Sequence, residues 1–149
     1  MAEIGFYHLT RTGPDQALPV LLGRTLAAGQ RAVVRCGTEE RVAALDTALW
    51  LAADPDWLPH GTAQSGTPDL QPIWLTNADE APNGATFLFL IDNTETAHLD
   101  RFTRVFDLFD GRDEVALAAA RLRWRKAKEA GHTLAYWQQT ARGWERKGG

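Results

Sequence analysis

The sequence predicts an α/β protein: a single, mostly parallel sheet flanked by helices. Short apolar segments rich in β-branched and aromatic residues alternate with longer segments whose apolar residues recur at helical spacing. This alternation is typical of parallel strands joined by helical crossovers. The chain has 149 residues, 44% of them hydrophobic and 23% charged, which suits one globular domain. Because no repeat or low-complexity segment interrupts it, we expect residues 1–149 to form one domain.

The first half of the chain predicts strand, helix, strand and helix in that order. Glu3–Leu9 is a short apolar run that ends before Gly13-Pro14-Asp15. Residues 18–26 have helical spacing, although Pro19 is tolerated only in a first turn. Residues 31–36 predict a second strand. The next helix runs to Trp50 from Thr38, a suitable N-cap followed by two glutamates.

The second half of the chain continues the alternation after a long loop at 53–71, whose length favours a functional role. Strands are expected at 73–76, 86–92 and 105–110, and helices at 96–102 and 113–130. The strand at 86–92 is nearly all apolar, as in a central strand covered on both faces. Gly131 ends the last long helix. We expect 131–149 to form a further short helix or a tail packed on the body.

The motifs of nucleotide-binding and catalytic α/β proteins are missing. An open sheet of this kind often binds nucleotides at the carboxyl ends of its strands. Here the first strand leads into a loop with one glycine, so the topology is Rossmann-like without a phosphate-binding loop. The sequence also lacks GxxxxGK[ST], GxSxG and HExxH. We therefore expect no catalytic residues and no cofactor.

Scattered polar residues keep a small nucleotide- or metabolite-binding enzyme open as an alternative. The four histidines lack metal-ligand spacing, so we expect no metal site; they are His8, His60, His98 and His132. Three aspartates follow or end apolar strands, where catalytic carboxylates can sit, although capping roles are commoner; they are Asp92, Asp107 and Asp110. An enzyme would use Asp92, Asp110 and His60.

The expected location is the cytoplasm. The N-terminus lacks the basic head and apolar stretch of a signal peptide, and no apolar run is long enough to span a bilayer. The single cysteine, Cys36, cannot form an internal disulfide and ends an apolar strand, so we expect a buried, inert thiol.

Charge is distributed unevenly along the chain. Residues 1–120 carry 17 acidic and 8 basic side chains, a balance of −9, whereas residues 121–149 carry 2 acidic and 8 basic ones, a balance of +6. A basic end on an acidic body favours an anionic partner, although basic residues also favour the last turns of a helix. Direct DNA binding by this basic helix is a further alternative. The net charge of −3 argues against it.

The last long helix brings cations and a tryptophan together. Trp124, Arg125 and Lys128 follow Arg121 at three, four and seven residues, so all four lie on one helical face. The spacing predicts a separate apolar face made of Val115, Ala118, Ala119 and Leu122. Arginine beside tryptophan suits a ligand with an aromatic group and a negative charge. Alternatively, Trp124 only covers the helix and Arg121 pairs with a nearby aspartate.

A second aromatic group lies in the segment WLAADPDWLPHG at residues 50–61. Two tryptophans, Trp50 and Trp57, surround a proline-rich turn. Large aromatic residues in such a loop either close the core or anchor a partner. The residues alone favour a lid on the core.

The ordered motifs resemble those of the chi subunit of the DNA polymerase III clamp-loader complex. They cover residues 3 to 144 and include FYHL at 6–9, LDTALW at 45–50, WLPHG at 57–61, VFDLFDG at 105–111, and Arg121-x-x-Trp124-Arg125. The resemblance implies a non-catalytic α/β domain that is similar to a nucleotide-binding fold without the nucleotide. It also implies a bacterial replisome adaptor that tethers the clamp loader to single-stranded DNA-binding protein.

The resemblance implies a site for the acidic C-terminal tail of single-stranded DNA-binding protein. That tail ends in Pro-Phe with a free carboxylate, preceded by aspartates. The site maps onto Arg121, Trp124 and Arg125, where Trp124 replaces a familiar tyrosine and Arg125 a familiar lysine. Lys128 would attract the aspartates, and Phe109 would form a wall of the groove. The adaptor requires no direct contact with nucleic acid and no membrane.

The resemblance implies a second contact surface, for the psi subunit that joins chi to the clamp loader. Its positions map onto Trp50 and Trp57, with Pro59 and His60 in the same loop. Trp57 replaces a familiar phenylalanine. Another clamp-loader part or a helicase is an alternative partner for this loop.

Overall fold

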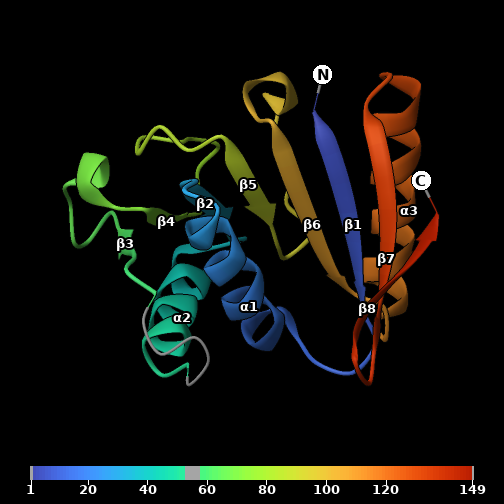
Figure 1. Ribbon diagram of the computed structural model, residues 1–149, viewed down its shortest axis with the longest axis horizontal. Coiled ribbons are helices and arrows are strands. Elements are labelled where there is room, and N and C mark those ends of the chain that lie inside the picture. The colour runs from blue at the N-terminus through green and yellow to red at the C-terminus, as the bar shows by residue number, and fades with distance from the viewer. Residues whose placement is uncertain (1, 53–57, 149) are drawn as a thin grey trace.

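The computed structural model describes residues 2–52 and 58–148 and confirms the α/β fold class (Figure 1). Its described strands form one eight-stranded sheet in the order β3-β4-β2-β5-β6-β1-β7-β8, parallel except for β8. The strands are β1 (Glu3–Leu9), β2 (Ala32–Arg35), β3 (Gly61–Thr62), β4 (Ile73–Thr76), β5 (Phe87–Leu90), β6 (Arg104–Asp110), β7 (Thr133–Thr140) and β8 (Gly143–Gly148). The helices are α1 (Pro14–Ala27), α2 (Glu39–Trp50) and α3 (Glu114–Glu129).

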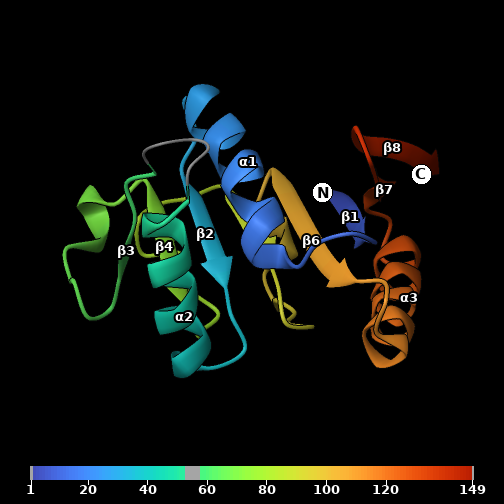
Figure 2. The same cartoon turned by 90° about the horizontal axis from the view of Figure 1, so that it is seen from below.

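The helices lie on both faces of the sheet, α1 and α2 on one and α3 on the other (Figures 1 and 2). Strand β1 shows how the sequence divides between the two cores, since successive side chains point to opposite faces. Tyr7 and Leu9 belong to the core under α1 and α2, whereas Ile4 and Phe6 belong to the core under α3. Both sets are buried because the strand is covered on both sides.

The first two helices agree with the sequence, except at the start of α1. Thr38 caps α2, since its hydroxyl oxygen accepts a hydrogen bond from the Arg41 amide at 3.1 Å. Helix α1 begins at Pro14, so Pro19 lies inside it and not in its first turn as expected. Proline has no backbone N–H, so α1 lacks one helical hydrogen bond at Pro19. The helix continues through this position because its leucines are buried against the sheet: Leu18, Leu21 and Leu22.

The prediction of a helix or tail after Gly131 is wrong, because 133–148 form a strand hairpin. Strand β7 adds to β1 in parallel, with Thr133 opposite Glu3, and β8 returns antiparallel to β7. Leu134 and Tyr136 point toward α3, while Trp137 packs against the opposite core. With apolar residues on both faces, the segment lacks the strict alternation that identifies a strand from sequence.

Two other segments differ from the sequence prediction: one contains less helix than expected, and the other contains more regular structure. The expected helix at 96–102 is a single 3-10 turn, Leu99–Arg101. The expected loop at 53–71 contains the short strand β3 and a 3-10 turn, Pro68–Leu70, within its described part. Strand β5 lies between β2 and β6, as expected for a central strand.

Helix α3 packs through a different face from the one its spacing predicts. Val115 and Leu122, two members of the predicted apolar face, are 76% and 51% exposed. The buried face consists of Ala116, Ala120, Arg123 and Ala127. Small alanines let the helix approach the sheet closely, while Val115 and Leu122 face solvent.

A buried ion pair fixes α3 to the centre of the sheet. The Arg123 guanidinium donates two hydrogen bonds to Asp107, at 2.6 and 2.9 Å, and one to Asn93 at 3.3 Å. Asp107 lies in the middle of β6 and not at a strand end as expected. Burial raises the pKa of Asp107, and Arg123 opposes that rise. The pair is a structural link, so Asp107 is unsuited to catalysis. Among the described residues, no helix has the length and apolar character needed to cross a bilayer.

Candidate functional site

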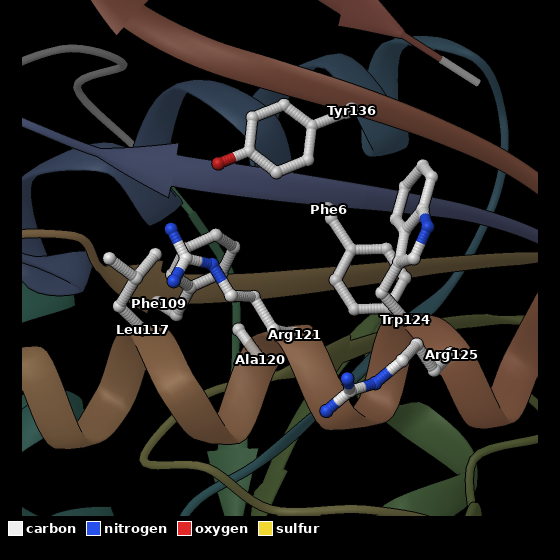
Figure 3. Close-up of a pocket in the computed structure, with 8 residues that line it drawn as sticks. All are labelled: Phe6, Phe109, Leu117, Ala120, Arg121, Trp124, Arg125 and Tyr136. Atoms are coloured by element: carbon white, nitrogen blue, oxygen red, sulfur yellow. The ribbon is translucent and has the colours of Figure 1, made fainter.

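A pocket of about 370 Å³ lies between α3 and β7 (Figure 3). Its lining comes from α3 and from three neighbouring strands, β6, β1 and β7. The lining residues are Phe6, Phe109, Leu117, Ala120, Arg121, Trp124, Arg125 and Tyr136. Five of these residues come from α3, and β6, β7 and β1 contribute one each. Tertiary packing therefore creates the pocket.

Aromatic rings form the frame of the pocket. Trp124 meets Phe6 edge-on at 5.2 Å between ring centroids, and it meets Tyr136 edge-on at 5.9 Å. Phe109 lies 6.4 Å from Tyr136 and completes the far wall. Trp124 is half-buried, so it does belong to the packing surface, contrary to the expectation that it lies apart from it. Rings that hold one another in this way offer a preformed apolar surface.

Two guanidinium groups lie at the mouth of this apolar surface. Arg121 and Arg125 are exposed, and Figure 3 shows the Arg121 side chain beside the Phe109 ring and the Arg125 guanidinium over the α3 ribbon. Within the described part of the chain, no carboxylate lies within salt-bridge distance of either. The alternative in which Arg121 pairs with a nearby aspartate is therefore wrong for every aspartate that the structure describes. Two arginines without a carboxylate partner among the described residues give the mouth a chemistry that suits an anion.

His8 and Tyr136 form a polar edge of the pocket. The Tyr136 hydroxyl and His8 Nδ1 share a short hydrogen bond, and the His8 ring lies 5.2 Å from Phe109. Burial, and then the charge of Arg121, lower the pKa of His8. Burial raises the pKa of Tyr136, and Arg121 opposes this rise. The Arg121 charge therefore acts on both groups, and a neutral His8 suits a pocket mouth that is already cationic.

The pocket gathers four of the five residues predicted for tail binding: Arg121, Trp124, Arg125 and Phe109. Lys128 does not line it, but this exposed lysine lies one helical turn beyond Trp124. The sequence did not indicate the other four lining residues. Phe6 could have been found from the alternation in β1. Tyr136 could not, because its strand was predicted as a helix or tail.

The predicted psi-contact residues separate into an exposed and a buried part. Trp50 is 55% exposed and the neighbouring Leu51 is 79% exposed, so the expectation that Trp50 closes the core is wrong. His60 is buried under the Trp50 ring, 4.2 Å away, and its Nε2 lies 3.0 Å from Asp46. His60 therefore positions Trp50 and does not itself face a partner. Pro59 is half-buried. Trp57 lies outside the described residues.

The side chain of Gln139 binds the loop that follows β1. In nucleotide-binding folds the loop after the first strand presents backbone N–H groups to the phosphate. Here Gln139 of β7 enters that loop, and its Oε1 accepts hydrogen bonds from the amides of Thr10, Arg11 and Thr12 at 2.9 to 3.1 Å. The loop amides already have a partner, so this geometry disfavours the nucleotide-binding alternative.

The polar residues of the alternative enzyme are dispersed in ion pairs. Asp92 accepts hydrogen bonds from the Gly37 amide at 3.0 Å and from Arg41 at 3.2 Å. Asp110 pairs with Arg112 at 2.9 Å, and His60 lies under Trp50. Across residues 2–52 and 58–148, no three metal-ligating side chains gather into a group. Asp92, Asp110 and His60 therefore make no common site.

Comparisons with known proteins agree with the resemblance seen in the sequence. A protein-family model described as "DNA polymerase III chi subunit, HolC" matches residues 1–135. A curated protein of Rickettsia prowazekii (strain Madrid E), named "Probable DNA polymerase III subunit chi", is 24% identical over 99 residues. The aligned region covers 66% of this chain and 60% of that relative.

Proposed function

Because the chain belongs to the family of DNA polymerase III chi subunits, which are replisome components, we propose that it is a non-catalytic adaptor. Its ligand would be the acidic C-terminal tail of single-stranded DNA-binding protein, and it would connect that protein to the clamp loader. The observation that carries this proposal is the pocket on α3. An aromatic frame and two arginines without carboxylate partners among the described residues suit an apolar residue that ends in a carboxylate.

The terminal phenylalanine of the tail would enter between Trp124, Phe109 and Tyr136. A pocket of about 370 Å³ is large enough for one aromatic side chain. Burying such a ring stabilises the complex by about 1.5–3 kcal/mol. The terminal carboxylate would then lie at the mouth, where Arg121 or Arg125 can bind it with two parallel hydrogen bonds.

The aspartates that precede the phenylalanine would lie along the exposed side of α3. Lys128 is one turn beyond Trp124 on that side and attracts them without needing a fixed geometry. These contacts are exposed, so they are screened by salt and act mainly on the rate of association. A tether of this kind needs only a weak contact, because it raises the local concentration of its partners.

The second contact of the adaptor would use the exposed surface of Trp50 together with Pro59, and it would include Trp57, which lies outside the described residues. His60 would hold the Trp50 ring in place from below. Tryptophan is enriched among the residues that anchor protein interfaces, and Trp50 is exposed. The partner would be the psi subunit, or another clamp-loader part or a helicase in its place.

The experiment is fluorescence anisotropy with a labelled peptide that matches the tail of the same organism's single-stranded DNA-binding protein. The chain is titrated as the parent and as Arg121→Ala and Trp124→Ala. Two matched controls come from the same helix: Lys126→Ala removes a cation outside the pocket, and Leu122→Ala removes an exposed apolar side chain outside it. A peptide without the terminal Pro-Phe tests the role of the phenylalanine.

We expect the parent to bind with micromolar affinity, about −8 kcal/mol. The two pocket variants should lose most of the binding, and the two control variants should retain it. Equal binding by the parent and both pocket variants would place the tail elsewhere on the chain. Failure of the parent to bind at low salt would refute the tether itself.

A further inference from the structure

A second groove lies on the opposite face of the sheet from the pocket on α3. In Figure 1, α1 and α2 lie in front of the β3–β5 side of the sheet and leave much of β1 and β7 uncovered. The groove has a volume of about 300 Å³ between α1 and the β7–β8 hairpin. Five aromatic residues line it: Tyr7, Phe87, Phe106, Trp137 and Trp144. Neither the proposed tail site nor the Trp50 surface uses these residues.

The rings form a platform on the surface of the sheet. The Tyr7 ring lies over Gly5, which has no side chain. A Cβ atom at Gly5 would come within 2.7 Å of the ring. Trp137 is nearly parallel to Tyr7, at 9° and 6.2 Å, and Trp144 meets Tyr7 edge-on at 5.0 Å. Tyr7 is buried, whereas Trp137 and Trp144 are only half-buried and keep part of their surface open. The platform can therefore accept a further planar group.

Three arginines from three elements surround the platform. Arg104 of β6 lies over Phe106 at 4.7 Å, and Arg146 of β8 lies 6.0 Å from the Trp137 ring. Arg24 of α1 lines the groove from the other side. Burial raises the pKa of Tyr7, while the charges of Arg104 and Arg24 oppose that rise. Glu3 is the carboxylate that acts on Tyr7, and no described carboxylate lies within salt-bridge distance of these three arginines.

We propose that this groove binds single-stranded DNA, with bases against Trp137 and Trp144 and phosphates on Arg24, Arg104 and Arg146. Aromatic platforms beside a row of cations are the usual means of holding single strands without sequence preference. Several rings and three separated cations suit a ligand in which bases and phosphates repeat. An acidic tail with one terminal phenylalanine would use only part of such a groove.

The net charge of the chain sets the expected strength of this contact. A protein of charge −3 repels a polyanion at long range, so binding is weak and falls steeply with salt. The groove nevertheless borders the basic end of the chain, since β8 carries Arg146 and Lys147. The contact would act together with the tail site on the opposite face, as a second weak attachment to coated DNA.

The test is anisotropy of a short labelled oligodeoxythymidine titrated with the full chain at low salt. Arg24→Glu/Arg146→Glu reverses two exposed cations of the groove without touching the core. We expect this double variant to lose at least tenfold in DNA affinity while it binds the acidic tail peptide as the parent does. Arg112→Glu, an exposed charge reversal outside the groove, should keep DNA affinity within about twofold.

A second variant tests the platform separately from the charges. DNA should quench the tryptophan fluorescence of the parent, and Trp144→Phe should reduce this quenching, because a base stacks on that ring. The proposal is overturned if the parent does not bind the oligonucleotide at low salt. It is also overturned if Arg125→Glu removes DNA binding while the groove double variant keeps it. A groove that binds free thymidine nucleotide or the tail peptide, but not the oligonucleotide, would overturn it as well.

Discussion

Removal of Arg123 should destabilise the chain far more than removal of any exposed cation of α3. Arg123 and Asp107 are 8% and 4% exposed, and two hydrogen bonds of 2.6 and 2.9 Å join them. Replacing Arg123 by methionine keeps the apolar stem and leaves the Asp107 carboxylate buried without its counter-ion. Breaking a buried pair from one side costs about 3–5 kcal/mol. For a chain of this length that lowers the melting temperature by roughly 6–20 °C.

The assay is thermal and urea unfolding followed by circular dichroism, with a double-mutant cycle. Lys126→Met is the matched control, since Lys126 lies on the same helix as Arg123 and pairs with Glu95, but both partners are more than half exposed. Its cost should be about 0–1 kcal/mol. The double variant Asp107→Leu/Arg123→Met should recover much of the lost stability, because no buried charge then lacks a partner.

The result that would refute this reasoning is a loss for Arg123→Met no larger than that of Lys126→Met. The pair would then contribute as little as a surface ion pair. The reasoning would also be contradicted if the stability lost by the double variant equalled the sum of the losses of Asp107→Leu and Arg123→Met. Additive losses would mean that the two side chains do not interact. Tail-peptide affinity measured on the same variants would show whether the docking of α3 also sets the geometry of the pocket.

Three further predictions concern the pocket and the core. Gly111→Ala places a Cβ atom 1.7 Å from His8 Nε2, so it should displace His8 from Tyr136, lower stability by about 1–3 kcal/mol in urea unfolding, and weaken tail binding; unchanged values would contradict the crowding. The pKa of His8 is lowered on folding, so as pH falls the unfolded chain protonates His8 before the folded chain does. Stability should therefore fall as pH drops below about 6.5, and His8→Gln should flatten this dependence. Cys36 is buried and burial raises its pKa to about 12, so it should resist iodoacetamide at pH 8 until urea unfolds the chain; rapid alkylation of the folded chain would refute this.

The sequence predicted part of the tail site because that part lies on one helix. Arg121, Trp124 and Arg125 recur at helical spacing, so local geometry alone places them on one face. Phe109 came from the preceding strand as a suggested wall, and the structure does place it in the lining. The role of these residues in binding remains a prediction.

The partners of that helix could not be predicted from periodicity. Tyr136 lies in a segment with apolar residues on both faces, which hides its strand character. Arg123 lies in the basic C-terminal part of the chain, yet it is buried, with Asp107 opposite it in the fold. A charged residue gives no sequence signal of burial when its counter-ion is 16 residues away on another element.

The sequence by itself determined the α/β class, the parallel strands and most element boundaries, because these depend on local periodicity, caps and breakers. The tertiary structure decided which face of α3 is buried, that the C-terminal segment extends the sheet, and that Gln139 occupies the loop after β1. It also decided that arginines lie beside aromatic rings on both faces of the sheet. Such features depend on contacts between residues distant in sequence, and the pattern along one segment carries no record of them.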